Sequence, residues 1–162
     1  MNKAIVFIVV GALVMAMLGF AFAATSQTTA ATATVNEFLS VTLSNVPVTF
    51  PSMDPGVTAN ANVGNGFPLN ATLGAETNVN ANVTTEANQT NFVSGSNTFA
   101  VSNMEWSATS TFPGTNYTTS PATVCSGLTA NGKCGIYHRL AIPAAQAAGT
   151  YQVGVKVSAV KT

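Results

Sequence analysis

The chain has 162 residues, of which only 6% are charged, and its formal net charge is zero. Ordinary soluble domains carry about 25% charged residues, and nucleic-acid-binding domains are usually basic. The composition therefore gives no electrostatic case for a nucleic-acid partner. Polarity comes instead from Thr, Asn and Ser, which suit the exposed faces of strands and turns.

The first 23 residues have the layout of a secretory signal peptide. Lys3 supplies the positive start, and residues 4–20 form an apolar stretch before a small-x-small motif that ends at Ala23. We expect cleavage between Ala23 and Ala24, which leaves about 139 of the 162 residues, enough for one domain with its own core. Two alternatives stay open: an uncleaved membrane anchor, and a type IV pilin-like signal that is cut before the apolar stretch and retains it.

A long β-strand pattern follows the signal. Apolar and polar residues alternate from residue 31 to residue 44 with the period of a half-buried strand, and only the pair Glu37-Phe38 reverses the order. At about 3.3 Å per residue this segment would span about 45 Å, more than twice the length of a usual strand. We therefore do not expect one domain to bury all of it.

The rest of the chain alternates short strand patterns with turn signals. Pro55-Gly56 is placed for a type II turn, Asn131-Gly132 for a tight turn, and a slip of the alternation near Ser102-Asn103 predicts a β-bulge. Strand patterns cover residues 46–50, 57–63, 67–73, 77–85, 97–108, 135–142 and 151–159, while residues 143–149 allow at most a helical turn. This order predicts an all-β fold, an antiparallel β-sandwich of the immunoglobulin-like or jelly-roll type with a projecting N-terminal strand.

Two cysteines flank the predicted Asn131-Gly132 turn. Cys125 and Cys134 enclose a short loop, and paired cysteines are typical of exported chains. We expect a disulfide between them that contributes about 2–3 kcal/mol to stability. The alternative is a pair of free thiols.

Candidate catalytic or metal-binding groups are few and scattered. His138 is the only histidine, and apolar residues two positions away on either side place it on an inward face or beside an interface. The carboxylates are spread along the chain without a paired or calcium-loop spacing. Trp106 is best interpreted as a core residue. We expect no enzyme activity, no metal site and no cofactor.

Asn-x-Ser/Thr sequons offer candidate N-glycosylation sites. They begin at Asn70, Asn82, Asn88 and Asn116. Chance alone gives about three such tripeptides in a chain so rich in Asn, Ser and Thr. The argument for glycosylation is instead that an exported protein with few charges needs another source of hydration.

Charges are segregated along the chain. All acidic residues lie between Glu37 and Glu105, and the basic residues after the signal begin at Lys133. One interpretation is complementary contact between successive copies of the chain. The other is that the two halves mix within one sandwich.

Together these features resemble archaeal surface filaments built by donor-strand complementation, the bundling pili and threads, and the related bacterial biofilm fibre protein TasA. The resemblance rests on the signal, the Thr/Ala/Val-rich segment from Ala24 to Val35, the turn after Phe50 at Pro55-Gly56, and Ala148-Gly149-Thr150-Tyr151 before an alternating last strand.

The resemblance implies a head-to-tail homopolymer on the cell surface. In such filaments the N-terminal segment of one subunit completes the sandwich of the next by β-augmentation. Residues 24–36 would be the donor segment, with Ala31, Ala33 and Val35 as its inward side chains and Asn36 and Glu37 as the hinge. Residues 37–162 would form the sandwich domain. The partners would be identical subunits, with neighbouring filaments or a cell surface as further contacts.

Two other functions are consistent with the residues. One is a secreted or membrane-anchored β-sandwich for adhesion, whose N-terminal segment pairs with its own sheet. The other is the type IV pilin-like subunit, which predicts a mature N-terminus near Ala4 or Ile5.

Overall fold

The computed structural model describes residues 30–61 and 68–162. The predicted signal peptide, its cleavage site at Ala23 and Ala24, and residues 24–29 lie outside the described residues. The chain divides into two compact units, residues 1–35 and residues 36–162. Residues 30–35 are exposed and belong to no strand. The described residues contain no helix that is both long enough and apolar enough to cross a membrane.

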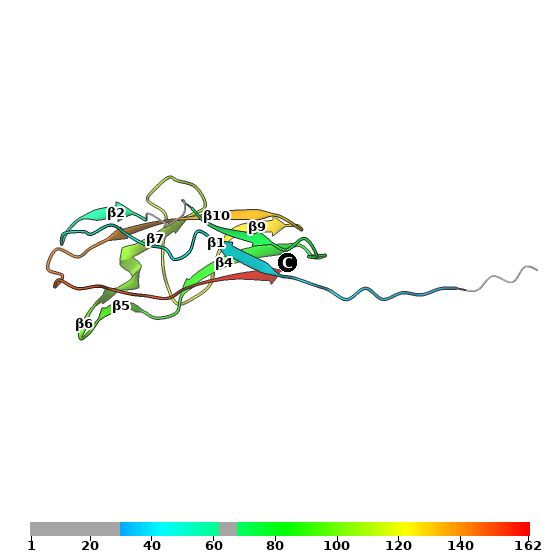
Figure 1. The fold of residues 1–162 in the computed structure, drawn as a ribbon, viewed down its shortest axis with the longest axis horizontal. Coiled ribbons are helices and arrows are strands. Elements are labelled where there is room, and N and C mark those ends of the chain that lie inside the picture. The colour runs from blue at the N-terminus through cyan, green and yellow to red at the C-terminus, as the bar shows by residue number, and fades with distance from the viewer. Residues whose placement is uncertain (1–29, 62–67) are drawn as a thin grey trace, which may run out of the picture. The chain divides into compact units, whose positions relative to one another are not determined.

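Residues 36–162 fold into an antiparallel all-β sandwich, as the sequence predicts (Figure 1). One sheet has the order β1 (Val41–Ser44), β3 (Leu69–Leu73), β10 (Lys133–Ala141), β7 (Met104–Ser107) and β8 (Thr115–Asn116), and β2 (Thr58–Asn60) also pairs with β10. The other sheet has the order β11 (Val155–Lys161), β4 (Ala81–Ala87) and β9 (Ala122–Leu128). A separate hairpin joins β5 (Asn91–Ser94) to β6 (Asn97–Ala100), and a 3-10 turn, η1 (Val101–Asn103), leads into β7.

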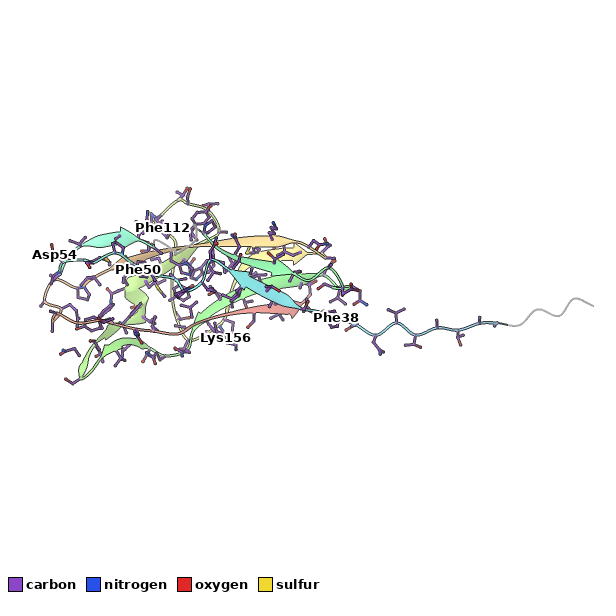
Figure 2. All side chains as sticks on the ribbon, in the orientation of Figure 1. Phe38, Phe50, Asp54, Phe112 and Lys156 are labelled. Carbon is purple, nitrogen blue, oxygen red and sulfur yellow. A yellow bond between two sulfur atoms is a disulfide. The ribbon has the colours of Figure 1, made fainter. Side chains whose placement is uncertain are left out.

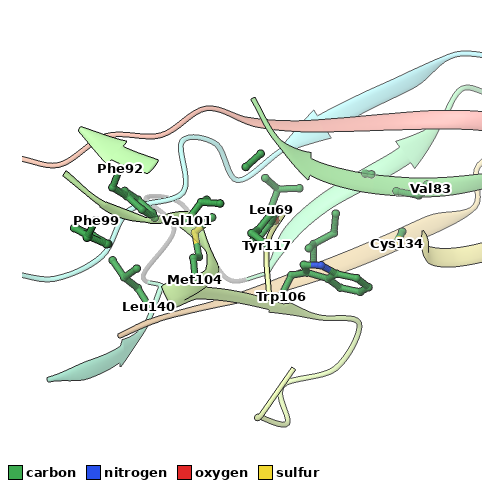
Figure 3. Close-up of a cluster of buried hydrophobic side chains, with 13 residues drawn as sticks. Leu69, Val83, Phe92, Phe99, Val101, Met104, Trp106, Tyr117, Cys134 and Leu140 are labelled. Atoms are coloured by element: carbon green, nitrogen blue, oxygen red, sulfur yellow. The ribbon is translucent and has the colours of Figure 1, made fainter. Parts of the chain in front are cut away.

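The core lies between the two sheets and follows from the two-residue period. Along β3, β4 and β10 buried side chains alternate with half-buried ones, because successive side chains of a strand point to opposite faces. Trp106 is in this core, as predicted, and Tyr117 and Met104 are almost fully buried (Figure 3). Its other members are Leu69, Ala71, Val83, Ala87, Phe92, Phe99, Val101, Cys134, Ile136 and Leu140.

Two turns form where the sequence places them. Gly56 has a φ of 83°, and the Val57 N–H donates to the Asp54 carbonyl at 3.2 Å, which closes the Pro55-Gly56 turn. Between β9 and β10, Asn131 has a φ of 60° and the Gly132 N–H donates to the Thr129 carbonyl at 2.9 Å. Asn tolerates this left-handed conformation better than most residues.

The N-terminal half of the chain corrects two predictions. The long strand pattern forms a strand only at β1, and residues 30–40 pair in no strand. The predicted strand at residues 46–50 is irregular instead. Pro47 follows a cis peptide bond and Pro51 comes directly after the segment, and neither has an N–H to donate to a ladder.

Other strand boundaries are also shifted. The expected bulge near Ser102-Asn103 is the 3-10 turn η1, which absorbs the same one-residue slip. The last strand begins at Val155 rather than at Tyr151, and β4 begins at Ala81 rather than at Thr77. Strands β5, β8 and β9 are absent from the predictions. The residues of β9 include Gly127, whose φ of 66° interrupts the alternation that would have identified the strand.

Candidate functional site

One flank of the sandwich is open. β1 and β11 each stand last in their sheets, so each has one edge without a neighbouring strand. An apolar groove of about 880 Å³ lies along this flank. Residues 46–55 form one wall, residues 146–157 form the other, and the floor includes the buried residues Leu69, Phe92, Phe99, Met104 and Leu140. A groove of this size and character is a default binding site.

The first wall is rich in proline. Val48 and Phe50 contact the core from this wall and are half-buried. Pro47, Pro51 and Pro55 recur every four residues along it and have no N–H to donate. The first wall therefore offers apolar side chains but a poor edge for strand pairing.

The second wall has an orderly free edge. Gln152 exchanges two main-chain hydrogen bonds of 3.0 Å with Val93. The Gly154 N–H donates to Asn88 Oδ1 at 3.0 Å, and the Gly154 carbonyl accepts from the Asn88 N–H at 2.9 Å. Even-numbered residues of this wall thus direct their main-chain groups toward the β4 and β5 side.

Odd-numbered residues of the second wall must then direct their main-chain groups toward the groove, because these groups alternate along an extended strand. Among the described residues, no partner hydrogen-bonds to the main chain of Tyr151 or Val153. The side chains of Tyr151, Val153, Val155 and Val157 contact the core and line the groove. This edge presents unpaired hydrogen-bonding groups above an apolar floor, which is what an added strand requires.

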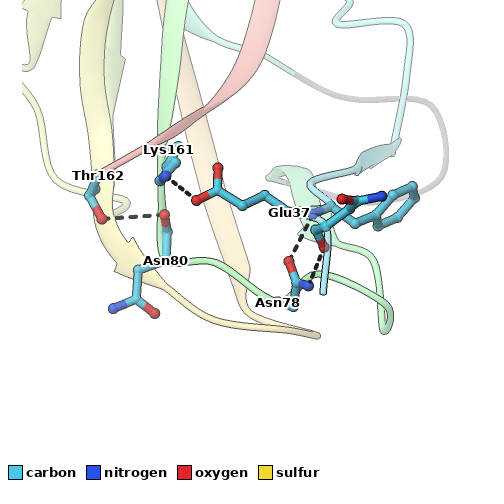
Figure 4. A network of polar contacts seen from close by, with 7 residues as sticks. Glu37, Asn78, Asn80, Lys161 and Thr162 are labelled. Atoms are coloured by element: carbon cyan, nitrogen blue, oxygen red, sulfur yellow. Dashed lines mark hydrogen bonds and ion pairs between the residues drawn. The ribbon is translucent and has the colours of Figure 1, made fainter. Parts of the chain in front are cut away.

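Asn78 holds the first residues of the domain by hydrogen bonds (Figure 4). Asn78 Oδ1 accepts from the Phe38 N–H, and Asn78 Nδ2 donates to the Asn36 carbonyl, both at 2.8 Å. The Asn78 N–H also donates to the Phe38 carbonyl at 3.2 Å. Glu37 forms an ion pair with Lys161 at the end of β11. The two predicted hinge residues, Asn36 and Glu37, are therefore held to the domain.

The sandwich has two well-separated ends. We call the end with Phe38, Asn78 and Lys161 the exit end. The turn at Asp54 lies at the opposite, far end, where the Gly56 N–H donates to the Ile142 carbonyl at 2.9 Å (Figure 2). The groove runs from Leu43 and Val157 to the far end, where residues 53–55 and 146–149 line it.

The other flank is closed by a covalent link. Cys125 on β9 and Cys134 on β10 form the predicted disulfide, with their Cα atoms 6.0 Å apart. Because β9 and β10 belong to different sheets, this bond joins the two layers. A disulfide also fits a protein outside the cytoplasm.

A chain of buried polar groups also joins the layers. His138 Nε2 lies 2.8 Å from the Tyr117 hydroxyl, which lies 3.0 Å from Thr85 Oγ1. Burial lowers the pKa of His138 from 6.5 to about 4 and raises the pKa of Tyr117 well above its ordinary value. His138 is thus neutral at pH 7 on an inward face, and its Nδ1 has no hydrogen-bond partner among the described residues.

The donor residues of the sequence prediction lie in the exposed N-terminal segment. Ala31, Ala33 and Val35 are exposed, and the Val35 side chain is 80% exposed. No group of three or more metal-ligating side chains occurs within the described residues.

The sequon asparagines differ in their surroundings. Asn82 and Asn88 use their side-chain oxygens to accept main-chain N–H groups of Gly127 and Gly154 at 3.0 Å. Asn70 lies half-buried on β3. Asn116 is exposed on the edge strand β8 and makes no side-chain hydrogen bond to a described residue. Among these four described residues, Asn116 alone is exposed without a described side-chain hydrogen bond.

The segregated charges meet within one sandwich. Arg139 pairs with Glu105 at 2.8 Å and Lys156 pairs with Glu86 at 2.7 Å, in addition to the Glu37 pair with Lys161. Arg139 also lies over the Phe112 ring at 4.9 Å. The order of charges along the sequence is thus explained by pairing inside the chain, and it gives no support to charge pairing between copies.

No family model and no curated protein matches the chain. Among solved structures, a family 123 glycoside hydrolase from Clostridium perfringens is similar, with 13% identity and a TM-score of 0.42. The match covers 76% of this chain and 25% of that one, so this chain spans about a quarter of its length.

Sequence reasoning did not find the groove. The walls are contributed by segments about 100 residues apart along the chain, and one of them was expected to be a strand. A usable signal was present in the prolines at positions 47, 51 and 55, whose spacing argues against strand pairing along that segment. The Asn78 contacts also went unrecognised, although Asn78, Asn80 and Asn82 form an alternating row of carboxamides.

Proposed function

We propose that the protein is the structural subunit of an extracellular cell-surface filament, in which the N-terminal segment of one copy fills the groove of the next. The observation that carries this proposal is the open flank itself. It combines an apolar groove of about 880 Å³ with an edge whose main-chain groups at Tyr151 and Val153 have no described partner. β-Augmentation satisfies both features at once.

The exposed segment comes directly before the domain. Residues 30–35 are exposed and belong to no strand. They lie within the predicted donor segment, residues 24–36.

The residue types also match. Ala31, Ala33 and Val35 alternate with Thr32 and Thr34, so one face of the segment is small and apolar. Small side chains suit a groove whose floor already carries large ones such as Phe92 and Phe99. Contacts of this kind are heterologous, and they build an open fibre where the rotation between successive copies does not close a ring.

Deletion of residues 24–35 behind an intact signal tests the proposal. The account predicts a secreted, folded monomer and no fibres by negative-stain microscopy. A matched control reverses the order of residues 24–30 and keeps residues 31–35, which should retain fibres. Fibres from the deletion variant would contradict donor-strand assembly.

A peptide experiment separates binding from export. A synthetic peptide of residues 24–36 should bind the deletion variant and raise its melting temperature, because ligand binding to the folded state stabilises it. A peptide with Ala31, Ala33 and Val35 replaced by Asp should not. Equal stabilisation by both peptides would show that the groove does not select the apolar face.

A further inference from the structure

The two walls of the groove offer a donor strand very different edges. The first wall carries Pro47, Pro51 and Pro55, which cannot donate hydrogen bonds. The second wall directs the main-chain groups of Tyr151 and Val153 into the groove without a described partner. An incoming strand therefore forms its hydrogen bonds with the second wall and only side-chain contacts with the first.

The direction of the incoming strand follows from where the domain begins and where the groove opens. The domain begins at the exit end, where Asn78 holds Asn36 and Phe38. The groove extends to the opposite, far end. In a head-to-tail fibre the exit end of one copy faces the far end of the next, so the donor enters at the far end with Val35 nearest the mouth and Ala31 deeper.

We infer that the donor segment of one copy pairs antiparallel with residues 151–157 of the next, with Val35 opposite Tyr151, Ala33 opposite Val153 and Ala31 opposite Val155. The inference rests on the proposed function. Residues 151–157 run from the far end toward the exit end, whereas a donor that enters at the far end runs the opposite way. Antiparallel pairing then adds a fourth strand beside β11, β4 and β9.

The register follows from the unpaired edge and from the alternation. The extended edge begins beside the bridge between Val93 and Gln152, so Val35, the donor residue that enters last, is placed opposite Tyr151. Odd-numbered residues of the second wall present their main-chain groups, so their partners in the donor must be the residues whose side chains also face the floor. Ala31, Ala33 and Val35 meet this condition, and a shift by one residue would turn Thr32 and Thr34 inward instead.

The same geometry separates assembly from self-closure. If the N-terminal segment folded back into the groove of its own domain, it would enter from the exit end. It would then run parallel to residues 151–157 rather than antiparallel. An antiparallel segment therefore fills the groove of a neighbouring copy, and a parallel segment fills the groove of its own domain.

Paired cysteines at four positions test the orientation. Antiparallel pairing predicts disulfides in A33C/V153C and in A31C/V155C, since paired residues have Cα atoms about 5.5 Å apart, within disulfide range. The swapped variants A31C/V153C and A33C/V155C contain the same positions and should not link. The predicted links should appear between copies, as a ladder on a non-reducing denaturing gel of the assembled fibres, with most subunits cross-linked.

Each outcome decides the inference. Links in both predicted variants and in neither swapped variant support it. Links in both swapped variants indicate parallel pairing and overturn it, and a link in only one swapped variant overturns the register. Fibres without any link overturn it as well. Failure of the unaltered chain to form fibres is a separate result, because it overturns the proposed function itself and the inference with it.

Discussion

The two flanks of the sandwich are built in opposite ways. The closed flank joins the sheets through the Cys125–Cys134 disulfide, and the buried chain from His138 to Thr85 joins them between the middle strands β10 and β4. The open flank leaves an apolar groove and an unpaired edge between β1 and β11. The links between the two sheets therefore do not depend on the open flank.

The largest expected effect comes from blocking the groove. Val153→Arg places a charge on the half-buried face of the second wall and should reduce fibre yield at least tenfold, because desolvating an unpaired charge is costly. Gln152→Arg is the matched control, since Gln152 is exposed one position away. Quantitative microscopy and sedimentation measure the yield. Equal loss in both variants would mean that the groove is not the assembly site.

Buried His138 should make the stability of the domain sensitive to acid. The pKa of His138 is about 4 in the fold and 6.5 without burial, so between these values the unfolded chain binds more protons. Stability is then fully present above pH 6.5 and falls by about 3 kcal/mol as the pH drops to 4. Urea unfolding at several pH values measures this loss. In His138→Gln the free energy of unfolding should depend less on pH over this range. An unchanged pH dependence would mean that other groups cause it.

Removal of the disulfide should weaken the closed flank by a similar or smaller amount. The double variant Cys125→Ser with Cys134→Ser opens a loop with a sequence separation of 9 and should lower the free energy of unfolding by about 2–3 kcal/mol. The groove lies on the other flank, so peptide binding by the folded variant should remain. Loss of peptide binding at temperatures where the variant is folded would show that the flanks are not independent.

The smallest effect is expected at the exit end. Asn78→Ala removes two hydrogen bonds that hold the chain at Asn36 and Phe38, and these exposed bonds contribute less than about 1 kcal/mol each. Stability should change little, while amide exchange at Phe38 becomes faster and fibres become more flexible. Asn80→Ala is the control, because Asn80 contributes its main-chain carbonyl to Thr162. If both variants formed identical fibres, the contacts of Asn78 with Asn36 and Phe38 would play no part in the direction in which the N-terminal segment leaves the domain.

The sequence predicted the features that depend on local patterns. Alternation identified the sandwich, Pro55-Gly56 and Asn131-Gly132 identified their turns, and the cysteine spacing identified the disulfide. Each of these signals lies within about ten residues. The core position of Trp106 and the inward face of His138 followed from the same alternation.

Features that depend on distant segments were beyond a local pattern. The groove arises because residues 46–55 and 146–157 end up on the same flank, and neither segment indicates the other. The strand prediction for residues 46–50 was wrong because proline outweighed a favourable run of Val and Phe. The donor residues Ala31, Ala33 and Val35 stay predictions, since a single copy of the chain does not contain the partner that would order them.

A cryo-electron microscopy map of fibres assembled from the unaltered chain tests the central claim most directly. The account predicts continuous density for a strand in every groove, antiparallel to residues 151–157 and connected at Asn36 to the neighbouring subunit. A groove that is empty, or that holds the N-terminal segment of its own subunit, would contradict it.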